Sequence, residues 1–196
     1  MTDSQTPSPK QALVLLAQGC EDVEAVTILD VLHRGGVGVF GAAVGSREVV
    51  ECAHNTRLKP QYAFARKEAW PRWGYHYDAI VVPGGMGGTL FLAANPDVLD
   101  ELRKADARGC IVAAVCAGPM VLDAAGVLAG HRYCCYPGIE KKISSPGATY
   151  VPGVPTVVDG NVVTGTGPGT AALFALAVLR ALGGPADSVA SAMLIS

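Results

Sequence analysis

The feature that most constrains the fold is the alternation of short apolar runs with helical patterns. Runs such as QALVLLA (11–17), VGVFGAAV (37–44) and CIVAAV (110–115) are continuously apolar, which is typical of strands covered on both faces. Between such runs lie EDVEAVTILDVLHR (21–34) and PDVLDELRKADARG (96–109), which have helical spacing and helix-ending glycines. This alternation predicts an α/β fold, a three-layer sandwich with a mostly parallel sheet and helices on both faces.

The remaining segments extend the same pattern. DAIVVPGG (78–85) predicts a strand that ends in a glycine turn, PGGMGG (83–88). Further along, the sequence predicts a helix over 117–128, a strand over 132–136, a strand pair over 156–166 that turns at Asp159–Gly160, and a long buried helix over 169–183. The stretch 48–77 is less regular, and we expect short antiparallel strands and loops there. In open parallel sheets the functional residues lie at the carboxyl ends of the strands.

Length and composition indicate one domain. The chain has 196 residues, of which 50% are hydrophobic, enough for one compact domain over 11–196. Residues 1–10 are rich in Ser, Thr, Pro and Gln, a composition that cannot bury enough apolar surface to become ordered. We therefore expect a flexible N-terminal tail.

Charge and cysteine spacing exclude several classes of function. The 15 basic and 17 acidic residues are mixed and give a net charge of -2, so nucleic acid and anionic membranes are not expected partners. The first residues do not resemble a signal peptide, and no apolar run reaches the roughly 18 residues of a membrane span. We expect a cytoplasmic protein whose six cysteines are mostly reduced, without a disulfide framework, metal site or cofactor.

Cys116, in AAVCAGP (113–119), stands where a predicted strand passes directly into a predicted helix. Such a tight turn presents its side chain at the carboxyl edge of the sheet, as in the nucleophile elbow of hydrolases. Amides at the start of the following helix are expected to stabilise the thiolate and so to lower the pKa of the thiol below its usual value of about 8.5. The alternative is that Cys116 is a small buried hydrophobic residue that only fills the core.

Backbone amides near Cys116 are candidates to stabilise an oxyanion. Gly85 ends a neighbouring strand, and Ala117 follows the cysteine, so both amides are expected at the same sheet edge. Gly84, in the same glycine turn, is assigned to substrate binding. The alternative is that the turn is glycine-rich only because its backbone needs positive φ angles.

A nucleophile also needs a proton carrier, and no histidine stands in an obvious position to serve Cys116. Glu21, Asp22 and Glu24 follow the first predicted strand and so reach the same sheet edge. The presence of Glu21 and Asp22 is explained by the helix dipole, because their negative charges stabilise the positive N-terminal end of the helix. Glu24 lies among apolar residues, where burial would raise its pKa, and we assign it as the acid/base.

Four motifs, in order, carry a family resemblance: ALVLLAQGCEDVEAV, VVPGGMGG, AAVCAGP and GTGPGTAALFALA. Together they resemble the parkinsonism-associated deglycase branch of the ThiJ/PfpI superfamily, over about 11–184. The resemblance implies a flavodoxin-like fold and a homodimer. It also implies a reactive elbow cysteine at Cys116, a buried carboxyl partner at Glu24, and oxyanion amides at Gly85 and Ala117.

The resemblance also implies an activity. Members are credited with converting methylglyoxal or glyoxal into hydroxy acids without glutathione, and with repairing early glycation adducts. The partners it implies are therefore small dicarbonyls or glycated protein side chains.

The sequence departs from the family pattern at two positions. Tyr136 stands where the best-known animal members carry a histidine, and could bind substrate through a hydrogen bond. Ala117 replaces the histidine that follows the cysteine in protease-like members.

Two other functions compete with this prediction. In an oxidative-stress sensor or chaperone, Cys116 would be oxidised to a sulfinic acid that accepts a hydrogen bond from protonated Glu24. A peptidase or amidase would use the same cysteine, but the missing histidine counts against it. The PGGMGG turn (83–88) lacks the Lys-Ser/Thr ending of a phosphate-binding P-loop.

Overall fold

The computed structural model describes residues 9–45, 48–65 and 76–195. Residues 1–8, which form most of the predicted tail, lie outside the described residues. The predicted stretch 48–77 is described except for 66–75.

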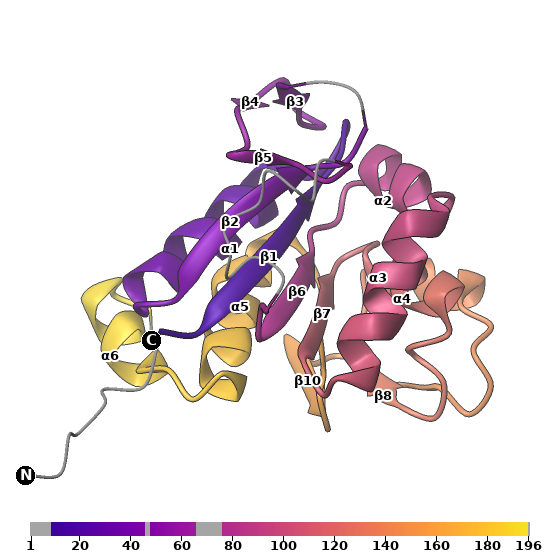
Figure 1. Cartoon of the computed structure of the whole chain (residues 1–196). Coiled ribbons are helices and arrows are strands. Elements are labelled where there is room, and N and C mark those ends of the chain that lie inside the picture. Colours follow the sequence, from indigo (N-terminus) through magenta and orange to yellow (C-terminus); the bar gives the residue numbers. More distant parts are fainter. Residues whose placement is uncertain (1–8, 46–47, 66–75, 196) are drawn as a thin grey trace, which may run out of the picture.

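A seven-stranded sheet with the order β10-β11-β7-β6-β1-β2-β5 forms the centre of the molecule (Figure 1). Its strands are β1 (Gln11–Leu16), β2 (Gly38–Ala43), β5 (Tyr62–Ala63), β6 (Ala79–Val82), β7 (Ile111–Val115), β10 (Thr156–Asp159) and β11 (Val162–Gly165). All neighbouring pairs are parallel except β10 and β11, which form an antiparallel hairpin. The predicted mostly parallel sheet is thus confirmed.

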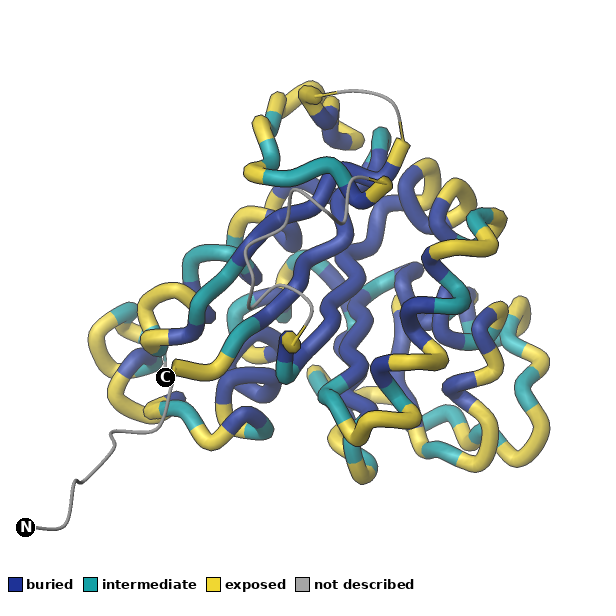
Figure 2. The backbone as a smooth tube through the Cα atoms, in the orientation of Figure 1, coloured by how far each residue is buried: buried dark blue, intermediate teal, exposed yellow. Residues whose placement is uncertain are grey.

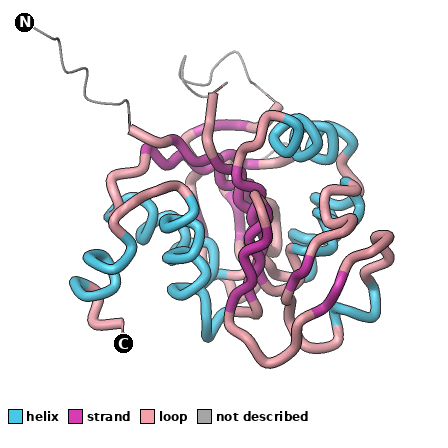
Figure 3. The backbone as a smooth tube through the Cα atoms, turned by 90° about the horizontal axis from the view of Figure 1, so that it is seen from below, coloured by secondary structure: helices cyan, strands magenta, loops and turns pink. Residues whose placement is uncertain are grey.

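Helices cover both faces of this sheet (Figures 1 and 3). On one face lie α1 (Asp22–Arg34), α5 (Ala171–Ala181) and α6 (Ala186–Ala192), and on the other α2 (Met86–Ala93), α3 (Pro96–Ala107) and α4 (Pro119–Ala125). No helix among the described residues is both long and apolar enough to cross a membrane.

The period of two in the strands creates one apolar core on each face. In β1, Leu13 and Leu15 pack with α3 and α4, whereas Ala12, Val14 and Leu16 pack with α1 and α5. Successive strand side chains point to opposite faces, so a continuous apolar run is needed to fill both cores. Figure 2 shows the central strands buried under helices whose outer faces are exposed.

Local signals explain where α1 and α3 begin. The Glu21 carboxylate accepts a hydrogen bond from the Glu24 amide (2.8 Å) at the start of α1. The Asn95 side chain caps α3, whose first residue is Pro96. Capping side chains satisfy amides that have no partner within the helix.

The peripheral strands differ from the prediction in part. β3 (Val50–Glu51) and β4 (Arg57–Leu58) form an expected antiparallel pair, but β5 pairs with β2 in parallel. The predicted strand over 132–136 is reduced to β8 (Arg132–Tyr133), which pairs with β9 (Thr149–Tyr150) outside the main sheet. Short segments at an edge are placed by tertiary contacts, which their own pattern does not encode.

Helix boundaries also differ from the prediction. The predicted PGGMGG turn is only partly a turn, because α2 begins at Met86 and includes Gly87 and Gly88, residues that disfavour helices. α4 ends earlier than predicted, at Ala125, and the following Gly126 has a left-handed φ of 79°. α6 was not predicted, and the short 3-10 turns η3 (Ile139–Lys142) and η4 (Pro168–Thr170) complete the fold.

Candidate functional site

The candidate site lies at the carboxyl ends of β1, β6 and β7, which are neighbours in the sheet. The chain leaves β1 toward Glu24, leaves β6 at Gly84 and Gly85, and leaves β7 at Cys116. Parallel neighbours end at the same edge, so the topology brings these three segments together.

Cys116 occupies a strained backbone position. Its φ of 62° is in the left-handed region, which a non-glycine residue rarely adopts and which is common at functional turns. Two backbone hydrogen bonds hold it there: its amide donates to Gly165 O (3.0 Å), and its carbonyl accepts from the Tyr136 amide (3.0 Å). Its side chain is only partly buried, unlike that of a pure core residue.

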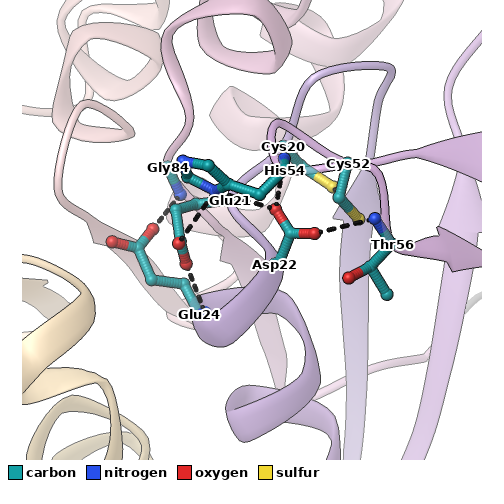
Figure 4. Close-up of polar contacts among 8 residues, drawn as sticks. All are labelled: Cys20, Glu21, Asp22, Glu24, Cys52, His54, Thr56 and Gly84. Carbon is teal, nitrogen blue, oxygen red and sulfur yellow. Dashed lines mark hydrogen bonds and ion pairs between the residues drawn. The ribbon is translucent and has the colours of Figure 1, made fainter.

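Glu24 reaches the cysteine across Gly84. The Gly84 amide donates to Glu24 Oε2 (2.7 Å), as Figure 4 shows. A Cβ atom at Gly84 would lie 2.5 Å from Cys116 Cβ and 2.6 Å from Glu24 Oε2. Only a residue without a side chain therefore lets the carboxyl and the cysteine approach each other here.

The Glu24 carboxyl is inaccessible to solvent. The residue is 0% exposed, and its Oε1 is buried without a hydrogen-bond partner. Burial raises the pKa of Glu24 to about 7, against the lowering effect of the Gly84 amide and the Cys116 side chain. Such a carboxyl can hold or release a proton near neutral pH.

The expected lowering of the thiol pKa is wrong. Burial raises the pKa of Cys116 to about 12, and the charge and hydrogen bond of Glu24 add to this effect. The amides of Gly85 and Ala117 lower it, as expected, but too weakly to reverse the direction. The sequence revealed the helix start but not the depth at which the sulfur lies beside a carboxylate, where a second negative charge is costly.

Gly85 and Ala117 both direct their amides at the Cys116 sulfur. Gly85 has a φ of 86°, and a Cβ atom there would lie 2.3 Å from Gly19 O. Both its conformation and its close packing therefore require glycine. Ala117 is buried, and these two amides are oriented as donors to negative charge near the sulfur.

Tyr136 lies beside the cysteine, at the surface. Its amide contacts Cys116 O, and its ring lies against Gly167, where a Cβ atom would be 3.2 Å from Tyr136 Cδ2. The residue is 50% exposed. The structure thus brings all six predicted site residues to one sheet edge.

A second polar cluster, which the sequence did not reveal, shares the start of α1 (Figure 4). Asp22 accepts hydrogen bonds from the amides of His54 (2.8 Å) and Thr56 (3.0 Å), and from His54 Nδ1 (3.2 Å). The acids after β1 gave a signal for a helix start, but their hairpin partners lie more than thirty positions away.

Glu21, Asp22 and His54 are the residues that could hold a metal ion in the described part of the chain. Their candidate ligand atoms all lie within 4.8 Å of one another. The carboxylates are already occupied, because Asp22 binds the hairpin amides and Glu21 caps α1. These contacts account for the cluster without a metal.

Fold and site together define an α/β protein of flavodoxin-like architecture with a cysteine at a strand-to-helix elbow and a buried glutamate beside it. Residues 10–181 match the DJ-1/PfpI family. The chain belongs to this family.

Individual relatives agree with that assignment. The chain is 34% identical to Protein dj-1beta of Drosophila melanogaster, over 95% of this chain and 98% of that protein. It is 37% identical to the glutathione-independent glyoxalase DJR-1.2 of Caenorhabditis elegans, over 90% of each chain. The crystal structure of Drosophila DJ-1beta superimposes with a TM-score of 0.88 and covers 96% of this chain and 99% of that one.

Proposed function

We propose that the protein is a glutathione-independent glyoxalase and deglycase that acts on methylglyoxal-type dicarbonyls and early glycation adducts. The observation that carries this proposal is the approach of Glu24 and Cys116 across Gly84, with the Gly85 and Ala117 amides directed at the sulfur. A relative that is named a glutathione-independent glyoxalase supports it.

The first step is addition of the sulfur to the aldehyde carbon of methylglyoxal. Because the thiol pKa is high, the thiol keeps its proton until Glu24 accepts it while the C–S bond forms. The aldehyde oxygen gains negative charge, which the Gly85 and Ala117 amides stabilise. Glu24 then passes the thiol proton to this oxygen, which gives a hemithioacetal on Cys116 and restores the Glu24 carboxylate.

The remaining steps isomerise the hemithioacetal and add one water. Glu24 removes the proton from the former aldehyde carbon and delivers it to the neighbouring ketone carbon, while the hydroxyl proton passes to the former ketone oxygen. The product is a thioester of lactate. Water then cleaves the thioester, releases lactate and restores the thiol. The aldehyde is oxidised and the ketone is reduced within one molecule, so the reaction balances without a cofactor.

Deglycation would begin in the same way. In an early methylglyoxal adduct on a lysine or cysteine side chain, the carbinol carbon is bonded to the amine or thiol. The Cys116 sulfur displaces the amine or thiol from this carbon, Glu24 passes the Cys116 thiol proton to the leaving nitrogen or sulfur, and the same hemithioacetal forms. Tyr136 is half exposed, and its amide contacts Cys116 O, which supports the proposal that its hydroxyl group binds such substrates.

A homodimer and a cytoplasmic location are part of the same proposal. Val23 and Val26 of α1 are 52% and 45% exposed. A second copy of the chain would cover such an apolar helix face.

The second candidate is a sensor that works through oxidation of Cys116. It is favoured by the unpartnered Oε1 of Glu24, because a protonated carboxyl with a pKa of about 7 could donate a hydrogen bond to a sulfinate. In that case the same two residues would stabilise an oxidised sulfur rather than a hemithioacetal.

Lactate formation from methylglyoxal separates these candidates. We expect the purified protein to form lactate, and Cys116→Ser to form none above the buffer rate. Cys110→Ser is a matched control, because Cys110 precedes β7, is also partly buried and lies at the other end of that strand. If the native protein forms no lactate but Cys116 oxidises to a sulfinic acid, the sensor is supported and the glyoxalase proposal fails.

A further inference from the structure

Cys20 and Cys52 form a pair of neighbouring thiols outside the proposed mechanism. Cys20 follows β1 and Cys52 follows β3, yet their sulfur atoms lie 3.5 Å apart in the interior (Figure 4). We propose that this pair is a redox modification site, a dithiol that a peroxide converts into a disulfide within one chain.

The backbone holds the two cysteines side by side. Gly19 N donates to Glu51 O (2.8 Å), and Ala53 N donates to Cys20 O (2.8 Å), so hydrogen bonds join the two segments on both sides of the pair. A disulfide requires the sulfur atoms to approach to about 2.05 Å. The two sulfur atoms, now 3.5 Å apart, must therefore approach each other by about 1.5 Å.

The hairpin that covers the pair is small. Cys52 is 5% exposed and Cys20 is 1% exposed, but Glu51 and residues 53–57 around Cys52 are all exposed. Each strand of the hairpin has only two residues. Segments with few buried contacts open at low free-energy cost, which gives a molecule as small as hydrogen peroxide access to Cys52 first.

Nearby charges affect both the rate at which Cys52 is oxidised and the equilibrium between the dithiol and the disulfide. Burial raises the pKa of Cys52 against the lowering effect of its hydrogen bond with Cys20, and the Asp22 and Glu21 carboxylates at the start of α1 raise it further. His54, in the same hairpin, contacts both carboxylates, and Glu51 and Arg57 of the hairpin form an exposed ion pair. Because thiolates are the attacking species, oxidation is slow at neutral pH. Because the reduced pair is not stabilised as thiolate, the disulfide resists reduction once formed.

The reaction balances with a peroxide as the oxidant. The Cys52 thiol attacks one peroxide oxygen, forms an S–O bond and breaks the O–O bond, which gives a sulfenic acid and one water. The Cys20 thiol then attacks the Cys52 sulfur, forms the S–S bond and releases a second water. Two thiols are oxidised and one peroxide is reduced.

Peptide mapping after peroxide treatment tests the proposal. The intact protein is treated with hydrogen peroxide until Cys116 is fully oxidised, alkylated under denaturing conditions, digested and analysed by mass spectrometry. We expect a cross-linked peptide pair containing Cys20 and Cys52, two hydrogens lighter than the sum of its parts, which dithiothreitol separates. The cross-link should persist in Cys116→Ser and Cys110→Ser and disappear in Cys20→Ser and Cys52→Ser.

Three results would overturn the proposal. These are recovery of both cysteines as free thiols, recovery of Cys52 as a sulfinic acid without a cross-link, and a cross-linked species with twice the mass of the chain. If a serine variant does not fold, the native peptide map still decides the question. No dicarbonyl is used, so failure here is distinct from failure of the proposed glyoxalase activity.

Discussion

Asp22 and Glu24 are carboxylates two positions apart on the first turn of α1, yet their pKa values move in opposite directions. At Asp22 burial acts to raise the pKa, but hydrogen bonds from Thr56 and His54 outweigh it and lower the value to about 2. At Glu24 burial prevails and raises it to about 7. The number of donors around a buried carboxylate, rather than burial alone, decides whether it clamps structure or moves protons.

The largest expected effect tests whether Cys116, beside Glu24, is the nucleophile. Cys116→Ser should reduce lactate formation from methylglyoxal to the rate without protein, because a serine hydroxyl beside Glu24 is a much weaker nucleophile. Lactate is measured over time at fixed folded protein concentration, with Cys110→Ser as the control. Retained turnover would remove the nucleophile from the mechanism.

The next effect concerns the proton carrier. Glu24→Gln should lower kcat/KM by about 10²–10⁴, the usual contribution of a general acid or base. In the native protein kcat/KM should rise with pH through about 7, because the ionised carboxyl accepts the thiol proton. That inflection should be absent in Glu24→Gln. An unchanged pH profile in the variant would assign the inflection to another group.

The pH dependence of stability should separate the two carboxylates. The pKa of folded Glu24 lies above its ordinary value of 4.5, so the folded state binds more protons between pH 4.5 and about 7. Stability should therefore fall as pH rises through this window, by up to about 3 kcal/mol, since one pKa unit corresponds to about 1.4 kcal/mol. Urea unfolding at several pH values measures this, and Glu24→Gln should flatten the curve.

Asp22 should behave in the opposite way. Its lowered pKa contributes stability that is present above its ordinary value of 3.8 and is lost as pH falls toward about 2. At neutral pH, Asp22→Asn should destabilise the protein by about 1–3 kcal/mol, because charged acceptors of the hairpin amides are replaced. The rate per folded molecule should stay the same, and a large loss of activity would contradict the division between the two sides of α1.

The smallest effect is expected for the histidine beside Asp22. His54→Ala keeps the backbone amide that Asp22 binds and removes a side chain that is 74% exposed. We expect a change in unfolding free energy within about 1 kcal/mol, as for exposed ion pairs. A loss as large as that of Asp22→Asn would show that the imidazole, and not the amide, forms the clamp.

The sequence was sufficient to predict the sheet and the elbow because both depend on local patterns. Apolar runs such as 11–17 and 110–115 specify buried parallel strands, and the strand-to-helix junction at Cys116 places its side chain at the sheet edge. The short strand β5 was misjudged, because its parallel pairing with β2 depends on tertiary contacts. α2 was missed, because Gly87 and Gly88 contradict the helix they belong to.

The electrostatics of the site could not be predicted in the same way. The direction of the Cys116 pKa depends on how deeply its sulfur lies and how near Glu24 comes, and neither is encoded in spacing. The contacts of Asp22 with the hairpin and of Cys20 with Cys52 join segments more than thirty positions apart. A single sequence contains no local signal for such pairs.

The left-handed backbone at Cys116 sets selection for stability against selection for activity. A glycine adopts a φ of 62° without the steric penalty of roughly 1 kcal/mol that a residue with a Cβ incurs. Random substitution followed by selection for thermal tolerance alone should therefore accept glycine at this position, and the resulting protein should lack the activity that depends on the sulfur. Retention of a sulfur there across generations would mean that the lineage still needs its chemistry.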